Sequence, residues 1–134
     1  FAFYRLDRIK EVCKSNECTN KNEMMMRADT AVQKLWGVSF GKENYTEKLE
    51  MTVRIAKDEE YILKRLEREK RNGTIQKLAN GDYKFTAEVY DASEMVPWIK
   101  TFTGRIVEIK CSNERVEKQI KEDFEMMKRI YEVR

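Results

Sequence analysis

The sequence predicts an α+β fold, on three observations. Segments from residue 47 onward alternate apolar and polar residues with the period of two that half-buried strands show. Other segments repeat their apolar residues every three or four positions, as amphipathic helices do. The predicted order is strand, helix, strand, strand, helix, strand, helix, which uses a strand–helix–strand unit twice around a hairpin. With right-handed crossovers, this order predicts one four-stranded antiparallel sheet with two helices on one face and a further helix at the end.

The first strand and helix are predicted over residues 47–55 and 58–71. Acidic residues 58–60 open the helix and basic residues close it before Asn72-Gly73, which complements the helix dipole. The strand has one wet face, because polar residues separate its apolar ones: Leu49, Met51, Val53 and Ile55.

A hairpin follows over 74–78 and 82–90, and its turn allows two registers. A two-residue Asn-Gly turn places Gln76 opposite Phe85 on the buried face, whereas a three-residue loop over 79–81 with a left-handed Gly81 places Ile75 there. Burying an unsatisfied amide costs about 1–3 kcal/mol, so we predict the three-residue loop.

The second half is predicted as a helix over 91–102, a strand over 105–111 and a long helix over 113–134. Asp91 and Glu94 have the spacing of a capping box, in which Glu94 reaches back to the helix start. Pro97 is close enough to the first turn to be tolerated. The whole order is that of a ferredoxin-like βαββαβ fold with an extra C-terminal helix, whose apolar stripe is Val116, Ile120, Phe124, Met127 and Tyr131.

The N-terminal part is predicted as an orphan strand and a helix. Residues 4–9 alternate and are rich in aromatic residues, which predicts a strand with no hairpin partner nearby. Residues 14–21 are polar and turn-prone, and 22–36 have helical spacing that ends at Gly37. We place the main boundary near Glu43, which divides the chain into 1–12, 13–43 and 44–134.

Composition restricts the chemistry of the chain. The 134 residues include 27 basic and 24 acidic ones, a net charge of +3 that permits nucleic-acid binding without demanding it. Histidine, the commonest general base and metal ligand, is absent. The three cysteines, Cys13, Cys18 and Cys111, cannot all pair and form no zinc signature, so we predict reduced thiols and neither a metal nor a cofactor. No uncharged run approaches the roughly 20 residues of a membrane span.

Three stretches together resemble one family. Residues 3–9 read Phe-Tyr-Arg-Leu-Asp-Arg-Ile, residues 35–41 read Leu-Trp-Gly-Val-Ser-Phe-Gly, and residues 91–107 include Trp-Ile-Lys-Thr-Phe-Thr-Gly at 98–104. In this order they resemble the end of the WYL domain, the stretch after it and the C-terminal extension (WCX) of bacterial WYL-domain transcriptional regulators. The similarity covers nearly the whole chain.

The resemblance implies a regulator with a winged helix-turn-helix, a small Sm-like WYL barrel that senses an effector, and an extension that helps it dimerise. Residues 1–12 would be the last strand of that barrel. Because no helix-turn-helix and no Trp-Tyr-Leu strand are present, we expect a C-terminal fragment that does not bind operator DNA unaided. The expected function is therefore a non-catalytic, cytoplasmic sensing and dimerisation module. Its expected partners are a second copy and a single-stranded nucleic acid or small effector, with no membrane.

The resemblance also selects the candidate binding residues. Arg5 and Arg8 match the arginines of the family motif, which are taken to face the effector groove, and Lys10 extends this basic edge. A guanidinium is a good phosphate partner because it can bond in a bidentate way. The alternative interpretation is a local salt bridge with Asp7 on a solvated surface.

Other residues have two open interpretations. The basic cluster formed by Arg65, Arg68, Lys70, Arg71 and Lys77 is either a binding surface or a solvated helix face stabilised by nearby acids. Met24, Met25 and Met26 fit an adaptable contact surface, with one or two of them expected in a core. Trp36 and Trp98 could stack on bases, although Trp98 is expected in the core.

Two competing functions are a purely structural dimerisation domain and a small enzyme on this scaffold, such as a phosphatase. Against an enzyme stand the missing histidine and the lack of a glycine-rich phosphate loop between Ile55 and Asp58. No nucleophile with a neighbouring base is evident either. We therefore predict no catalytic residues.

Overall fold

The computed structural model describes residues 1–16, 20–42 and 45–132. The chain divides into two compact units, Phe1–Gln33 and Lys34–Arg134. The boundary predicted near Glu43 falls outside the described residues, and the division between the units lies between Gln33 and Lys34.

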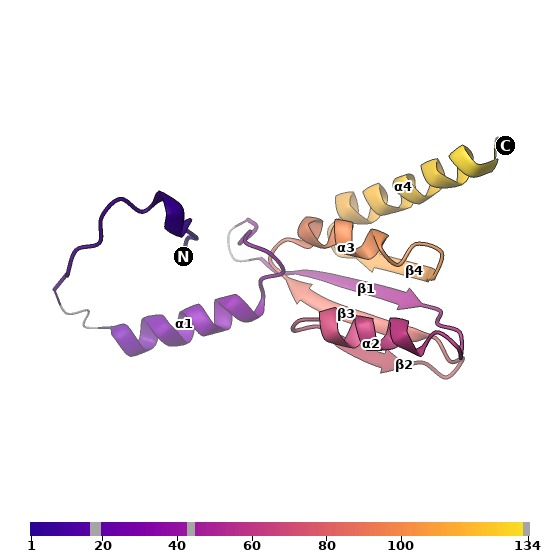
Figure 1. Ribbon diagram of the computed structural model, residues 1–134, viewed down its shortest axis with the longest axis horizontal. Coiled ribbons are helices and arrows are strands. Elements are labelled where there is room, and N and C mark those ends of the chain that lie inside the picture. Colours follow the sequence, from indigo (N-terminus) through magenta and orange to yellow (C-terminus); the bar gives the residue numbers. More distant parts are fainter. Residues whose placement is uncertain (17–19, 43–44, 133–134) are drawn as a thin grey trace. The chain divides into compact units, whose positions relative to one another are not determined.

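The first unit holds a short 3-10 helix, η1 (Leu6–Arg8), and the helix α1 (Lys21–Gln33) (Figure 1). The prediction of a strand over residues 4–9 is wrong. Their backbone forms local hydrogen bonds instead of bonds to a neighbouring strand: the Arg8 N–H donates to Arg5 C=O (3.0 Å) and the Ile9 N–H to Leu6 C=O (3.2 Å). A strand needs a neighbour for its backbone groups, and the described part of this unit contains none. Residues 1–12 therefore form no barrel strand here.

The helix α1 has little buried surface of its own. Ala31 is its one buried residue, and Val32 is exposed. Met24, Met25 and Met26 are exposed too, so the expectation that one or two of them lie in a core is wrong. An amphipathic spacing favours burial on one side of a helix, but burial also requires a surface to pack against.

The second unit is an α+β fold with one antiparallel sheet in the order β2-β3-β1-β4 (Figure 1). This order is compatible with the predicted ferredoxin-like arrangement. None of the helices in the described residues is long and apolar enough to cross a membrane. The elements are β1 (Glu47–Val53), α2 (Glu60–Glu69), β2 (Thr74–Lys77), β3 (Tyr83–Val89), η2 (Ala92–Met95), α3 (Val96–Lys100), β4 (Ile106–Cys111) and α4 (Glu114–Glu132).

The core covers one face of this sheet. Met51 pairs with Phe85 on β3 and with Ile109 on β4, so these three side chains share a face, and all are buried. Against them pack residues from the helices: Ile62, Leu66, Met95, Val96, Ile99, Val116 and Ile120. The opposite face is polar, and there Glu50 bridges Lys48 (3.2 Å) and Lys84 (3.3 Å).

The hairpin confirms the predicted three-residue loop. Ile75 pairs with Phe85, and Gln76, which is exposed, pairs with Lys84. The Leu78 N–H donates to Asp82 C=O (2.8 Å), the Gly81 N–H donates to Leu78 C=O (3.0 Å), and Gly81 has a φ of +92°.

The predicted capping box at Asp91 is half right. Asp91 accepts a hydrogen bond from the Ser93 N–H (3.0 Å) and starts η2, and Pro97 lies in the first turn of α3. Glu94 does not reach back to the helix start. Its carboxylate instead accepts hydrogen bonds from the loop at 37–39, more than fifty residues earlier in the chain.

The left-handed conformation of Gly81 allows a direct test of the hairpin. We expect Gly81→Ala to lower the free energy of unfolding by roughly 1–2 kcal/mol. Backbone strain is the cause, since a Cβ at this position would meet nothing within 4 Å. Urea denaturation measures the change. The control Gln76→Ala, at the exposed hairpin position, should stay within about 0.5 kcal/mol of the parent, and equal losses in both variants would contradict the loop.

Candidate functional site

Glu94 clamps the loop that leads into the second unit. Its Oε2 accepts a hydrogen bond from the Gly37 N–H (2.9 Å), and its Oε1 accepts from the N–H groups of Val38 (3.0 Å) and Ser39 (3.1 Å). A Cβ at position 37 would lie 2.6 Å from Glu94 Oε1, so the contact requires glycine there. Three charge-assisted bonds to consecutive backbone groups fix this loop firmly on η2.

Trp36 inserts beside this clamp. It is 7% exposed, and its ring centroid lies 4.9 Å from that of Trp98 and 6.4 Å from that of Phe85. The Arg71 guanidinium covers its ring at 4.9 Å. Trp36 is therefore a core residue with no free face for stacking on a base.

Glu69 forms hydrogen bonds at the edge of the aromatic cluster of Trp36, Trp98 and Phe85. Its carboxylate accepts hydrogen bonds from Trp98 Nε1 (2.9 Å) and Arg65 Nε (3.1 Å). Partial burial opposes the ionisation of Glu69, but the hydrogen bonds from Arg65 and Trp98 outweigh it and hold the pKa of Glu69 below its ordinary value.

The basic cluster predicted around α2 is mostly engaged in contacts of this kind. Arg65 also donates to Thr101 Oγ1 (2.7 Å) and lies 4.7 Å from the Phe102 ring. Lys77 lies 5.8 Å from the ring of Tyr83. These contacts favour the structural interpretation of the cluster over a binding surface.

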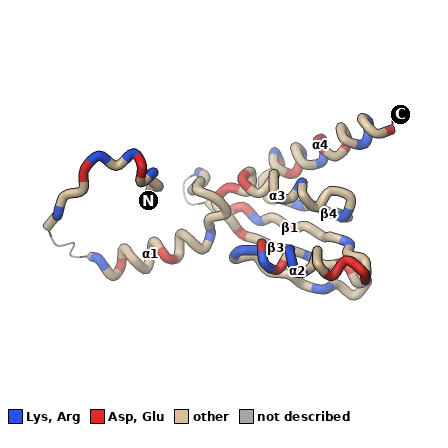
Figure 2. Tube along the Cα trace, in the orientation of Figure 1, with Lys and Arg blue, Asp and Glu red and all other residues tan. Residues whose placement is uncertain are grey.

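The three predicted site residues Arg5, Arg8 and Lys10 lie in the exposed N-terminal segment of the first unit, where Figure 2 shows basic and acidic residues following one another. Arg5 forms a bidentate pair with Asp7, Nη2–Oδ2 at 2.6 Å and Nε–Oδ1 at 3.0 Å. This pair is the alternative that the sequence allows. The binding role of the three residues stays a prediction.

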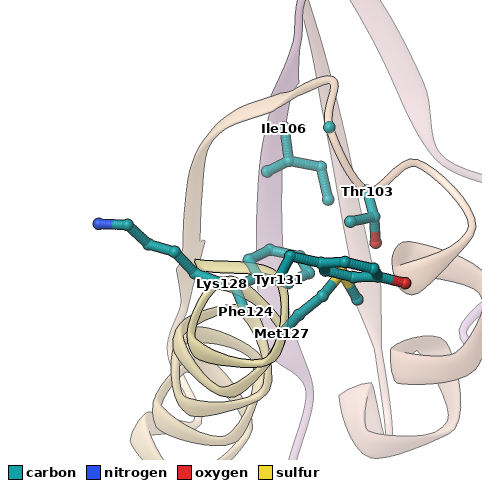
Figure 3. A pocket seen from close by; sticks show the side chains of 7 residues that line it. Thr103, Ile106, Phe124, Met127, Lys128 and Tyr131 are labelled. Atoms are coloured by element: carbon teal, nitrogen blue, oxygen red, sulfur yellow. The ribbon is translucent and has the colours of Figure 1, made fainter. Parts of the chain in front are cut away.

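A groove lies between the C-terminal half of α4 and the turn before β4 (Figure 3). Its volume is about 340 Å³. The helix side of the groove belongs to the predicted apolar stripe, but the turn residues were not predicted, because their proximity to α4 depends on how the helix packs. The lining residues are Thr103, Gly104, Ile106, Phe124, Met127, Lys128 and Tyr131.

The thiols of Cys13 and Cys111 are free; the first is exposed and the second buried. Burial raises the pKa of the Cys111 thiol, which makes it a poor nucleophile. Cys18 lies outside the described residues. Among the described residues, no three His, Cys, Asp or Glu side chains gather where they could hold a metal ion.

Comparison with protein-family models, curated proteins and solved structures finds no match for this chain. The three stretches singled out from the sequence lie at 3–9, 35–41 and 91–107. Two of them supply the two sides of the clamp: Gly37, Val38 and Ser39 on one side and Glu94 on the other.

We expect Glu94→Ala to lower the free energy of unfolding by about 2 kcal/mol, because three backbone donors lose a charged acceptor. Glu94→Gln should cost less, since its amide oxygen still accepts. Tryptophan fluorescence should shift to the red in Glu94→Ala as Trp36 gains exposure. The exposed control Glu67→Ala should change stability by less than about 0.5 kcal/mol, and an unshifted spectrum in Glu94→Ala would contradict the clamp.

Glu69 should make stability depend on pH. Because its pKa is lowered in the folded state, its contribution is present above the ordinary glutamate pKa of about 4.3 and is lost as the pH falls through the folded value. The free energy of unfolding, measured in urea between pH 7 and pH 3, should therefore fall less steeply in Glu69→Gln than in the parent. Parallel pH curves for the two proteins would contradict this role.

Proposed function

We propose that this chain is the sensing and dimerisation part of a WYL-type DNA-binding transcriptional regulator, a non-catalytic module that works in the cytoplasm. We propose also that its second unit is a ferredoxin-like βαββαβ domain with an extra C-terminal helix. The strand order β2-β3-β1-β4 and the antiparallel pairing of all neighbours support that fold.

The observation that carries the regulator assignment is the contact between two of the family-like stretches. Glu94, from the stretch at 91–107, holds the backbone at 37–39, from the stretch at 35–41. Trp36 and Trp98 from the same two stretches pack together. One contact thus joins residues that are far apart in the sequence and that resemble the family together.

The contact between Glu94 and the loop at 37–39 suits a module that senses a ligand in one part and dimerises through another. The clamped loop directly follows the first unit, whose N-terminal segment holds the candidate binding residues. In this proposal, the phosphate of a single-stranded nucleic acid or small effector displaces Asp7 from Arg5 and also engages Arg8 and Lys10. Sensing by this segment and dimerisation of the second unit are the two activities of the proposed module.

One observation favours the purely structural alternative. The Arg5 guanidinium already has a bidentate carboxylate partner in Asp7, so its charge is paired without any ligand. A chain of this kind would dimerise and bind no effector.

Binding of oligonucleotides separates the two functions. With the protein in its natural length, we expect the double variant Arg5→Ala/Arg8→Ala to weaken binding to a single-stranded DNA. Loss of two phosphate contacts should also reduce the slope of log affinity against log salt by about 1.4. The matched control Lys57→Ala/Arg115→Ala removes the same charge from exposed positions of the second unit and should retain the slope.

A dimer that does not bind single-stranded DNA at low salt would support the structural alternative. Equal slopes of log affinity against log salt in the two double variants would show that Arg5 and Arg8 do not contact the nucleic acid.

A further inference from the structure

The helix α4 is longer than the strand it packs against. It starts beside the end of β4, where the Cys111 N–H donates to Glu117 Oε2 (2.9 Å), and it reaches the start of β4, where Ile106 lines the groove with Phe124 and Met127 (Figure 3). Its 19 residues extend about 28 Å, whereas the six residues of β4 extend about 20 Å. The last turns of α4 therefore project past the sheet.

Burial along the apolar stripe of α4 falls at this point. Val116 is 3% and Ile120 0% exposed, whereas Phe124 and Met127 are half-buried and Tyr131 is 68% exposed. Ile130, beside the stripe, is 58% exposed. The stripe thus continues in sequence beyond the surface that this unit supplies to cover it. Exposed apolar side chains gathered at one end of a helix are typical of an interaction site.

The charges beside the stripe indicate what covers it. Each of the last four stripe residues is followed directly by a charged residue, and these signs alternate: Lys121, Glu125, Lys128 and Glu132. Steps of four, three and four residues keep the four charges on one side of the helix. In a parallel pair of identical helices, this side of one helix would face the opposite side of its partner, so the four charges would not meet their own copies. In an antiparallel pair, Lys121 faces Glu132 and Glu125 faces Lys128, so every pair attracts.

We infer that the C-terminal half of α4 pairs antiparallel with the same helix of a second copy, about a two-fold axis near Met126 and Met127. This inference rests on the proposed dimerisation and adds its surface and orientation. The pair would cover the exposed apolar side chains of both copies and bring two sets of opposite charges together. The ion pairs within the helix, Lys121 with Glu117 and Lys128 with Glu132 (3.7 Å), are surface contacts weak enough to share a new partner.

Charge reversal tests the orientation as well as the surface. We expect the parent chain to sediment as a dimer, with twice the 16.1 kDa of one chain. Glu125→Lys and Lys128→Glu should each weaken self-association about tenfold, because two symmetry-related pairs become repulsive. An equimolar mixture of the two variants should recover the parent affinity, since every facing pair is then opposite in charge.

Two further variants complete the experiment. Ile130→Glu places a charge in the apolar surface and should weaken the dimer at least about tenfold, while its exposed position leaves folding intact. Arg129→Glu reverses a charge on the same helix away from the alternating side and should keep the parent affinity.

The outcomes separate the inference from the proposed function. A parent chain that stays monomeric at millimolar concentration would overturn both the proposed dimerisation and this interface. A parent dimer whose affinity none of the variants changes would overturn the interface and leave dimerisation intact. A dimer weakened by Ile130→Glu but not recovered by mixing the charge variants would overturn the antiparallel arrangement.

Discussion

Burial of a single face of the sheet is the constraint on which the second unit depends. Leu49, Met51 and Val53 on β1 and Phe85 on β3 are fully buried, and residues from all the helices of this unit pack onto that face. The other face has alternating charges such as Lys48 and Glu50, which bond to each other and to Lys84. Because all the helices share one face, α4 lies alongside α3, where Lys100 pairs with Asp123, and its length exceeds what the sheet covers.

The same packing determines how the chain enters this unit. The loop at 34–41 is not a strand of the sheet, so most of its backbone groups need partners outside a strand ladder. Glu94 provides an acceptor for three of them, and Lys34 C=O accepts a hydrogen bond from the Tyr90 N–H (2.9 Å) at the end of β3. The apolar part of the loop is secured by Trp36, which lies between Trp98 and Arg71. Polar and apolar anchors thus act on the same few residues of this loop.

Local patterns account for much of the fold that could be predicted. The hairpin register followed from comparing a buried Ile75 with a buried Gln76, and both candidates lie within a dozen residues of their partner Phe85. The candidate site was less accessible to such reasoning. Capping geometry is local, and it correctly assigned Asp91, but the same rule sent Glu94 to the wrong backbone groups. Its true partners are 55 to 57 residues away, and no spacing rule connects them.

The sequence by itself determined the order of the strands and main helices in the second unit, the polar and apolar faces of the strands and the loop of the hairpin, because periodicity and turn chemistry act between near neighbours. Only the tertiary structure decided what each exposed or buried face meets. Residues 4–9 have the alternation of a strand, but Leu6–Arg8 form η1, since no strand in the described part of their unit pairs with them. Tyr131 continues an apolar stripe but is exposed, since the sheet ends before the helix does. Burial is a property of two surfaces, and a periodic pattern describes one of them.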